Sequence, residues 1–149
     1  MEIKKIILTR GIPGSGKTTW ALNWVKEDPE HRVRYNNDDI RNMCGKYWVP
    51  SREKLIEDVK KSFLLSIMDM GYDCVIDNMN LNPHEVESIN DFVKRNNESY
   101  LFNYEYRVET IDFKTPLQEC IERDSKRPHP IGAEIITQIY TKYHNFYIE

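Results

Sequence analysis

The chain has 149 residues, the length of about one soluble domain. Its 21 Lys and Arg against 24 Asp and Glu give a net charge of −3, which excludes the broad basic surface of proteins that coat duplex nucleic acid. Three scattered cysteines argue against a disulfide framework or a zinc site, and no apolar run is long enough to cross a bilayer. We therefore expect one cytoplasmic domain spanning residues 1–149, without membrane contact.

Strand and helix signals alternate through the first half of the chain. The apolar run at residues 6–9 is typical of a strand buried on both faces, and an amphipathic helix is expected after it. Residues 32–35 are a weaker, alternating strand candidate. From Ser51 a long helix is expected to end near Gly71. Its apolar residues recur every four positions: Leu55, Val59, Phe63 and Ile67.

The second half continues this alternation. Residues 74–76 are the next buried strand, and residues 82–85 (Asn-Pro-His-Glu) predict a helix start in which the Asn caps and the Glu returns a hydrogen bond. A strand is expected at residues 100–108, a short helix after Thr115 with the same cap-and-proline signature, and a last helix through residues 135–143. This pattern predicts an α/β domain with a mainly parallel sheet, whose ligands lie at the carboxyl ends of the strands.

Directly after the first strand, residues 11–18 (Gly-Ile-Pro-Gly-Ser-Gly-Lys-Thr) match G-x-x-x-x-G-K-[ST] in full. The glycines let successive N–H groups converge on a phosphate, and the following helix offers its unpaired first-turn N–H groups. Lys17 is expected to reach the β- and γ-phosphates and the Thr18 hydroxyl to ligate Mg²⁺. The candidate ligands of a nucleoside triphosphate here are Gly11, Pro13, Gly14, Ser15, Gly16, Lys17, Thr18 and Thr19.

An acidic segment follows the second expected strand, at residues 36–41 (Asn-Asn-Asp-Asp-Ile-Arg). Phosphoryl transfer to an alcohol needs a carboxylate that orients the hydroxyl and accepts its proton, and Asp38 or Asp39 is placed to do so. On a helix Arg41 would share a face with Asp38 and could meet a nearby anion. The alternative is that Asp38 only caps the helix, with Arg41 solvated.

Two further polar clusters follow predicted elements. Asp77 and Asn78, after the third strand, are candidates for seating the acceptor or holding water on Mg²⁺, and the alternative is an Asx turn. Arg123 and Arg127, one turn apart if their helix persists, are candidates for neutralising the donor phosphates from a short lid. The alternative for this pair is a solvated helix end, where cations are favoured anyway.

Together these segments resemble the phage-type polynucleotide 5′-hydroxyl kinases over essentially the whole chain. The distinguishing residues are the N-x-D-D-x-R segment at residues 36–41 and the late arginine pair. The resemblance implies a P-loop kinase fold, a parallel sheet with helices on both faces and a short lid. It also implies ATP or another NTP with Mg²⁺, and a 5′-OH end of DNA or RNA as acceptor. By this resemblance the donor nucleotide would be bound by Lys17, Thr18, Arg123 and Arg127. Asp38 would act as the general base, and Arg41 would bind the phosphate that follows the acceptor nucleoside. Asp77 and Asn78 would lie beside the acceptor.

The chain departs from this family in two ways. Met79 stands where the family's D-x-T-N element has threonine, so a hydroxyl contact to the acceptor is missing or supplied elsewhere. A carboxy-terminal 3′-phosphatase domain, frequent in these kinases, does not follow, so we expect a stand-alone kinase. Two other functions remain open: a small-molecule or nucleoside kinase, and a non-catalytic module that binds a triphosphate. The choice of DNA or RNA, the donor base and the oligomeric state are not indicated.

Overall fold

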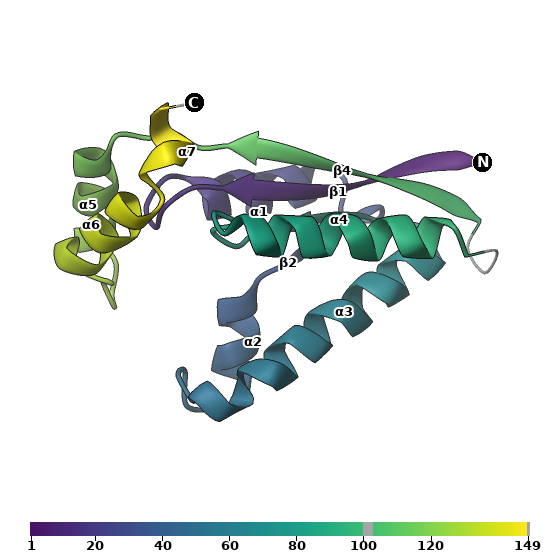
Figure 1. Cartoon of the computed structure of the whole chain (residues 1–149), viewed down its shortest axis with the longest axis horizontal. Coiled ribbons are helices and arrows are strands. Elements are labelled where there is room, and N and C mark those ends of the chain that lie inside the picture. The colour runs from purple at the N-terminus through teal and green to yellow at the C-terminus, as the bar shows by residue number, and fades with distance from the viewer. Residues whose placement is uncertain (100–102, 149) are drawn as a thin grey trace.

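A four-stranded parallel sheet forms the centre of the computed structural model, which describes residues 1–99 and 103–148 (Figure 1). The strands are β1 (Glu2–Arg10), β2 (Arg32–Tyr35), β3 (Asp73–Ile76) and β4 (Tyr104–Asp112). Their order is β2-β3-β1-β4, so β1 and β3 are central and are the most apolar. The predicted α/β class with a parallel sheet is confirmed.

Helices cover both faces of this sheet. The helical elements are α1 (Lys17–Glu27), α2 (Asn37–Met43), a 3₁₀ turn η1 (Pro50–Arg52), α3 (Glu53–Met70), α4 (Pro83–Asn97), α5 (Leu117–Ser125), α6 (Ala133–Lys142) and α7 (His144–Ile148). Ile6 and Leu8 of β1 pack with α3 and α4, whereas Ile7 packs with α1, because successive strand residues point to opposite faces. Helices α5, α6 and α7 gather beyond the carboxyl end of β1 (Figure 1). In the part of the chain described, no helix is both long and apolar enough to traverse a membrane.

Helix α3 buries a different stripe from the one that the four-residue spacing predicts. Leu55 is 49% exposed, and the buried apolar residues are Ile56, Leu64, Ile67 and Met68. A step of four residues overshoots one helical turn by about 40°, so three such steps rotate the stripe by about 120°. Of the predicted stripe, Ile67 is therefore fully buried, whereas Val59 and Phe63 are half-buried against the edge of the core. The helix ends at Gly71, as predicted, with φ +80°.

Strand β4 ends later than predicted. The expected residues 100–102 lie outside the described residues, and β4 runs from Tyr104 to Asp112. It pairs with β1 along its whole length, from Glu2↔Tyr104 to Arg10↔Asp112. This pairing extends the strand into residues 109–112, where Ile111 is the single apolar residue. It also places Phe113, whose N–H donates to the Arg10 carbonyl, beside the end of β1.

The observed ends of three helices agree only in part with the predictions. Asn82 caps α4 by accepting from the His84 N–H at 3.0 Å, but among the described residues the Glu85 side chain accepts no bond from the Asn82 N–H. Thr115 was expected to cap α5 and does not, because its hydroxyl donates to the Ser15 carbonyl at 2.8 Å. The last helix ends at Lys142, and the short α7 follows it.

Candidate active site

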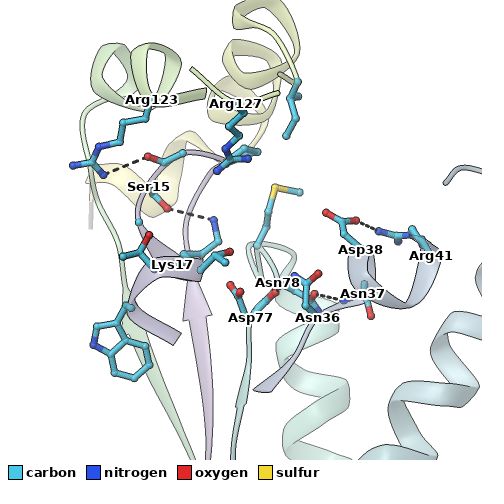
Figure 2. Close-up of a pocket in the computed structure, with 18 of the residues that line it drawn as sticks. Ser15, Lys17, Asn36, Asn37, Asp38, Arg41, Asp77, Asn78, Arg123 and Arg127 are labelled. Carbon is cyan, nitrogen blue, oxygen red and sulfur yellow. Dashed lines mark hydrogen bonds and ion pairs between the residues drawn. The ribbon is translucent and has the colours of Figure 1, made fainter. Parts of the chain in front are cut away.

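A cavity of about 780 Å³ lies at the carboxyl ends of the strands (Figure 2). It is lined by the loop after β1 and the start of α1, by α2, by the segment after β3, and by α5 with the loop that follows it. The candidates that line it are Pro13, Gly14, Ser15, Gly16, Lys17, Thr18, Thr19, Asp38, Arg41, Asp77, Asn78, Arg123 and Arg127. Gly11 lies behind this lining, where its N–H donates to the Met79 carbonyl at 3.1 Å. Trp20, Asn23 and Glu85 also line the cavity and are not among the site residues predicted from the sequence.

The loop of residues 11–16 takes a conformation that two glycines make possible. Gly14 and Gly16 have φ of +83° and +102°, a region that side chains disfavour. A Cβ on Gly14 would also lie 2.4 Å from the Cys120 carbonyl oxygen. Helix α1 begins immediately after Gly16, so its first-turn N–H groups face the loop without intrahelical acceptors. This is the geometry that binds phosphate.

Three contacts from the last quarter of the chain hold this loop in place. The Thr115 hydroxyl donates to the Ser15 carbonyl, and Arg123 Nη1 donates to the Gly14 carbonyl at 3.4 Å. The Tyr147 hydroxyl accepts from the Ile12 N–H at 3.1 Å. Burial raises the pKa of Tyr147 to about 12, so the phenol stays neutral. The loop of residues 11–16 therefore packs as one unit with the segment before α5 and with helices α5 and α7.

Lys17 is buried beside the loop. Its Nζ donates to the Ile12 carbonyl at 2.8 Å and to Ser15 Oγ at 3.3 Å. Burial lowers the pKa of Lys17 to about 8, although the negative charge of Asp77 and, to a smaller extent, that of Asp38 act to raise it. The cation is thus held over the loop at an energetic cost that a bound anion would relieve.

Asp38 stands on the other side of the cavity, on α2. The helix is capped by Asn36, whose side chain accepts from the Asp39 N–H at 2.9 Å, so the alternative that Asp38 is only a cap is wrong. Asp38 Oδ1 accepts from Arg41 Nη1 at 2.7 Å and from the Tyr47 hydroxyl at 2.8 Å. The Asp38 side chain is 53% exposed and points from α2 toward the space between the labelled residues (Figure 2).

Arg41 is shared between Asp38 and Glu53. Its Nε donates to Glu53 Oε2 at 3.0 Å and its Nη2 to Glu53 Oε1 at 2.5 Å. Hydrogen bonding to Glu53, and then to Asp38, raises the pKa of Arg41, and the same bond to Arg41 lowers the pKa of Glu53. The solvated Arg41 of the alternative interpretation is therefore not what the structure shows. Glu53, at the start of α3, was not anticipated from the sequence.

Asp77 is buried and paired with Arg34, a residue that the sequence interpretation did not single out. Arg34 Nε and Nη2 both lie 2.8 Å from Asp77 Oδ2, and Nη1 lies 2.6 Å from Asp39 Oδ2. Burial alone would lower the pKa of Arg34, but its bonds to Asp39 and Asp77 raise it. Within the described residues the Asp77 carboxylate bonds only Arg34, so an Asx turn at this position is wrong. Asn78 Oδ1 accepts from the Asn37 N–H at 2.9 Å, which gives a second tie between the end of β3 and α2.

Both lid arginines reach the cavity, although only one lies within a helix. Arg123 belongs to α5 and pairs with Glu119 at 2.6 Å, whereas Arg127 follows the helix end at Ser125. The loop after α5 is fixed by buried Asp124, which accepts from the N–H groups of Ile131 at 3.1 Å and Gly132 at 2.9 Å. Figure 2 shows both guanidinium groups on the side of the cavity opposite Asp77.

A parallel α/β sheet with a phosphate loop after its first strand and helices on both faces is the fold of a P-loop kinase, a class of ATP-dependent phosphotransferases. The sequence profile of the AAA_33 family, described as an AAA domain, matches residues 6–139. The chain therefore belongs to the AAA_33 family.

Solved structures share this fold at low sequence identity. The fold matches a chain in the structure of the Pnkp1/Rnl/Hen1 RNA repair complex, with TM-score 0.80 and 20% identity, over 98% of this chain and 46% of that chain. It also matches a gluconokinase from Sinorhizobium meliloti 1021, with TM-score 0.57 and 12% identity, over 96% and 76% of the two chains. The P-loop kinase fold implied by the resemblance is confirmed.

A short segment is similar to a human protein. Over 32 residues the chain is 61% identical to heterogeneous nuclear ribonucleoprotein U-like protein 2 of Homo sapiens, which is 22% of this chain and 4% of that protein. The chain thus spans a small fraction of this relative and under half of the repair-complex chain.

Proposed function

We propose that the chain is a polynucleotide 5′-hydroxyl kinase that transfers the γ-phosphate of ATP, or another NTP, to a 5′-OH end of DNA or RNA. The observation that carries the proposal is that one cavity is lined both by the phosphate loop and by Asp38 with Arg41. The structural likeness to a chain of an RNA repair complex supports a nucleic-acid acceptor and a role in end repair. The whole of residues 1–149 would serve as one kinase domain.

The donor side fits a triphosphate. The left-handed Gly14 and Gly16, the first turn of α1 and the buried Lys17 offer N–H groups and a cation to the β- and γ-phosphates. The Thr18 hydroxyl would ligate Mg²⁺, which takes most of its other ligands from phosphates and water and would neutralise charge on the transferred group. Arg123 and Arg127 would add positive charge from the opposite wall.

The acceptor side supplies a proton acceptor. In the proposed step the 5′-oxygen forms a bond to the γ-phosphorus while the bond from that phosphorus to the β–γ bridging oxygen breaks. The hydroxyl proton passes to the Asp38 carboxylate, and the nucleoside diphosphate leaves. Both hydrogen bonds that Asp38 accepts fall on Oδ1, and in the described part of the chain Oδ2 has no partner and is available for the hydroxyl.

Arg41 would bind the phosphate that follows the acceptor nucleoside. A guanidinium has five N–H donors, and Arg41 uses three in its bonds to Asp38 and Glu53. Two N–H groups of Arg41 remain for a ligand, and the carboxylates of Asp38 and Glu53 already neutralise part of the positive charge in this region. Such a group suits one phosphate rather than a long polyanion. This matches a chain whose net charge is −3.

The test is transfer of labelled γ-phosphate to a set of alcohols, with and without Mg²⁺. The set comprises a 5′-OH oligonucleotide, a 3′-phosphorylated nucleoside, the bare nucleoside and gluconate. We expect transfer to the first two and far less to the others. Transfer to gluconate or to the bare nucleoside alone would favour a small-molecule kinase, and nucleotide binding with no transfer would favour a non-catalytic module.

A further inference from the structure

Tyr47, outside the cavity lining, touches the proposed base directly. Its hydroxyl donates to Asp38 Oδ1 at 2.8 Å. We infer that Tyr47 is a positioning residue, which together with Arg41 fixes the Asp38 carboxylate so that Oδ2 faces the acceptor hydroxyl. This inference rests on the proposed function, because it assigns Asp38 the proton.

The two donors reach Oδ1 from different segments. Arg41 is on the same helix as Asp38, three positions on, whereas Tyr47 belongs to the loop between α2 and η1. An Asp side chain that is 53% exposed would otherwise exchange between rotamers. A single donor leaves the carboxylate free to rotate about that contact, and a second donor on the same oxygen restricts this rotation.

The loop that carries Tyr47 is itself fixed by Arg52. The Arg52 guanidinium donates to the carbonyls of Cys44, Lys46 and Tyr47, the first and last at 3.3 Å. Arg41 is held in turn by Glu53, the next residue along the chain. Arg52, the last residue of η1, thus anchors the loop that bears Tyr47, and Glu53, the first residue of α3, anchors Arg41. The junction of η1 and α3 therefore supports the position of the proposed base.

Tyr47 is suited to donate and contributes little else to the structure. Burial, and then its hydrogen bond to Asp38, raises the pKa of Tyr47, so the phenol keeps its proton at neutral pH and can donate it in a hydrogen bond. The residue is 48% exposed and belongs to none of the buried apolar clusters. Removing the hydroxyl alone should therefore spare the fold.

The experiment compares Tyr47→Phe with Tyr72→Phe, a matched control. Tyr72 lies just before β3, at the end of the sheet away from the cavity, and in the described residues its hydroxyl makes no hydrogen bond. Four quantities are measured for each variant: the thermal midpoint, the dissociation constants of nucleotide and oligonucleotide, the single-turnover transfer rate, and that rate in an Asp38→Asn background. A crystal structure of the ligand-free Tyr47→Phe variant is also determined.

We expect Tyr47→Phe to lower the transfer rate about tenfold, a modest cost for a misplaced catalytic group, with both dissociation constants within twofold of wild type. In the Asp38→Asn background the same change should have no further effect, because the group it positions is gone. Tyr72→Phe should change neither rate. If Tyr47→Phe lowers the transfer rate in the Asp38→Asn background as well, the positioning role is overturned. It is also overturned if the substitution weakens only oligonucleotide binding and leaves the transfer rate unchanged.

The crystal structure separates this inference from the proposed function. In Tyr47→Phe the Asp38 carboxylate should leave its wild-type position while α2 and the loop keep theirs. A carboxylate that stays in place would refute the role of Tyr47, whichever alcohol the enzyme phosphorylates. Failure of the wild type to phosphorylate any 5′-OH end would instead refute the acceptor assignment.

Discussion

Raising the pH through 8 is expected to weaken nucleotide binding at the phosphate loop. Burial lowers the pKa of Lys17 to about 8, so the ligand-free protein loses this charge in a range where an ordinary lysine keeps it. A bound triphosphate favours the ammonium form and takes up the missing proton. Affinity must therefore fall as the pH rises, because more of the free protein has to be protonated on binding.

The magnitude follows from the pKa. With a pKa of about 8, Lys17 is neutral in roughly a tenth of molecules at pH 7, in about half at pH 8 and in about nine-tenths at pH 9. The dissociation constant should thus rise about tenfold from pH 7 to pH 9, which is about 1.4 kcal/mol. The unfolded chain binds more protons than the ligand-free fold between this pKa and the ordinary 10.5, so the free energy of unfolding should rise over that range.

Isothermal titration calorimetry at pH 8 in two buffers of different ionisation enthalpy measures the proton uptake directly. We expect about half a proton per nucleotide bound, from the same pKa. Lys17→Met is the control, since it retains a long apolar side chain that does not titrate. Wild-type binding with no proton uptake, and with one dissociation constant from pH 7 to pH 9, would refute the account of Lys17.

Three substitutions test the rest of the site. Arg41→Ala should weaken binding of a 3′-phosphorylated nucleoside about tenfold and that of the bare nucleoside far less, because one charge-assisted contact is lost; equal losses would contradict the phosphate contact. Gly14→Ala should lower the free energy of unfolding by about 2 kcal/mol in urea titration, since its Cβ would meet the Cys120 carbonyl at 2.4 Å; a wild-type midpoint would refute this. Thr115→Val should cost about 1 kcal/mol and loosen nucleotide binding through the lost bond to Ser15, measured by thermal unfolding and titration. Unchanged values would show that this bond does not support the loop.

The parts of the site that the sequence predicts are those contained in short segments. The phosphate loop is eight consecutive residues between a strand and a helix, and Asp38 and Arg41 are separated by one helical turn. In both cases local geometry brings the side chains together, so spacing alone is informative. The fold class follows similarly from the alternation of strand and helix signals.

The parts that were missed depend on contacts between distant segments. Arg34 resembles any polar residue of an edge strand until β2 and β3 pair and bring it to Asp77, 43 positions away. Thr115 has a local capping signature, but β4 carries it to the Ser15 carbonyl, 100 positions away. Tyr47 is only nine positions from Asp38, yet its loop has no regular structure from which spacing would predict the contact. These contacts follow from strand register and loop packing, which the sequence pattern does not specify.

The central claim is that a nucleotide on the phosphate loop and a hydroxyl on Asp38 react within one cavity. Single-turnover transfer of labelled γ-phosphate to a 5′-OH oligonucleotide, by the wild type and by Asp38→Asn, measures this most directly. We expect Asp38→Asn to transfer about 10²–10⁴-fold more slowly, the range of a lost general base, and to bind nucleotide as the wild type does. Transfer by Asp38→Asn at the wild-type rate would contradict the claim.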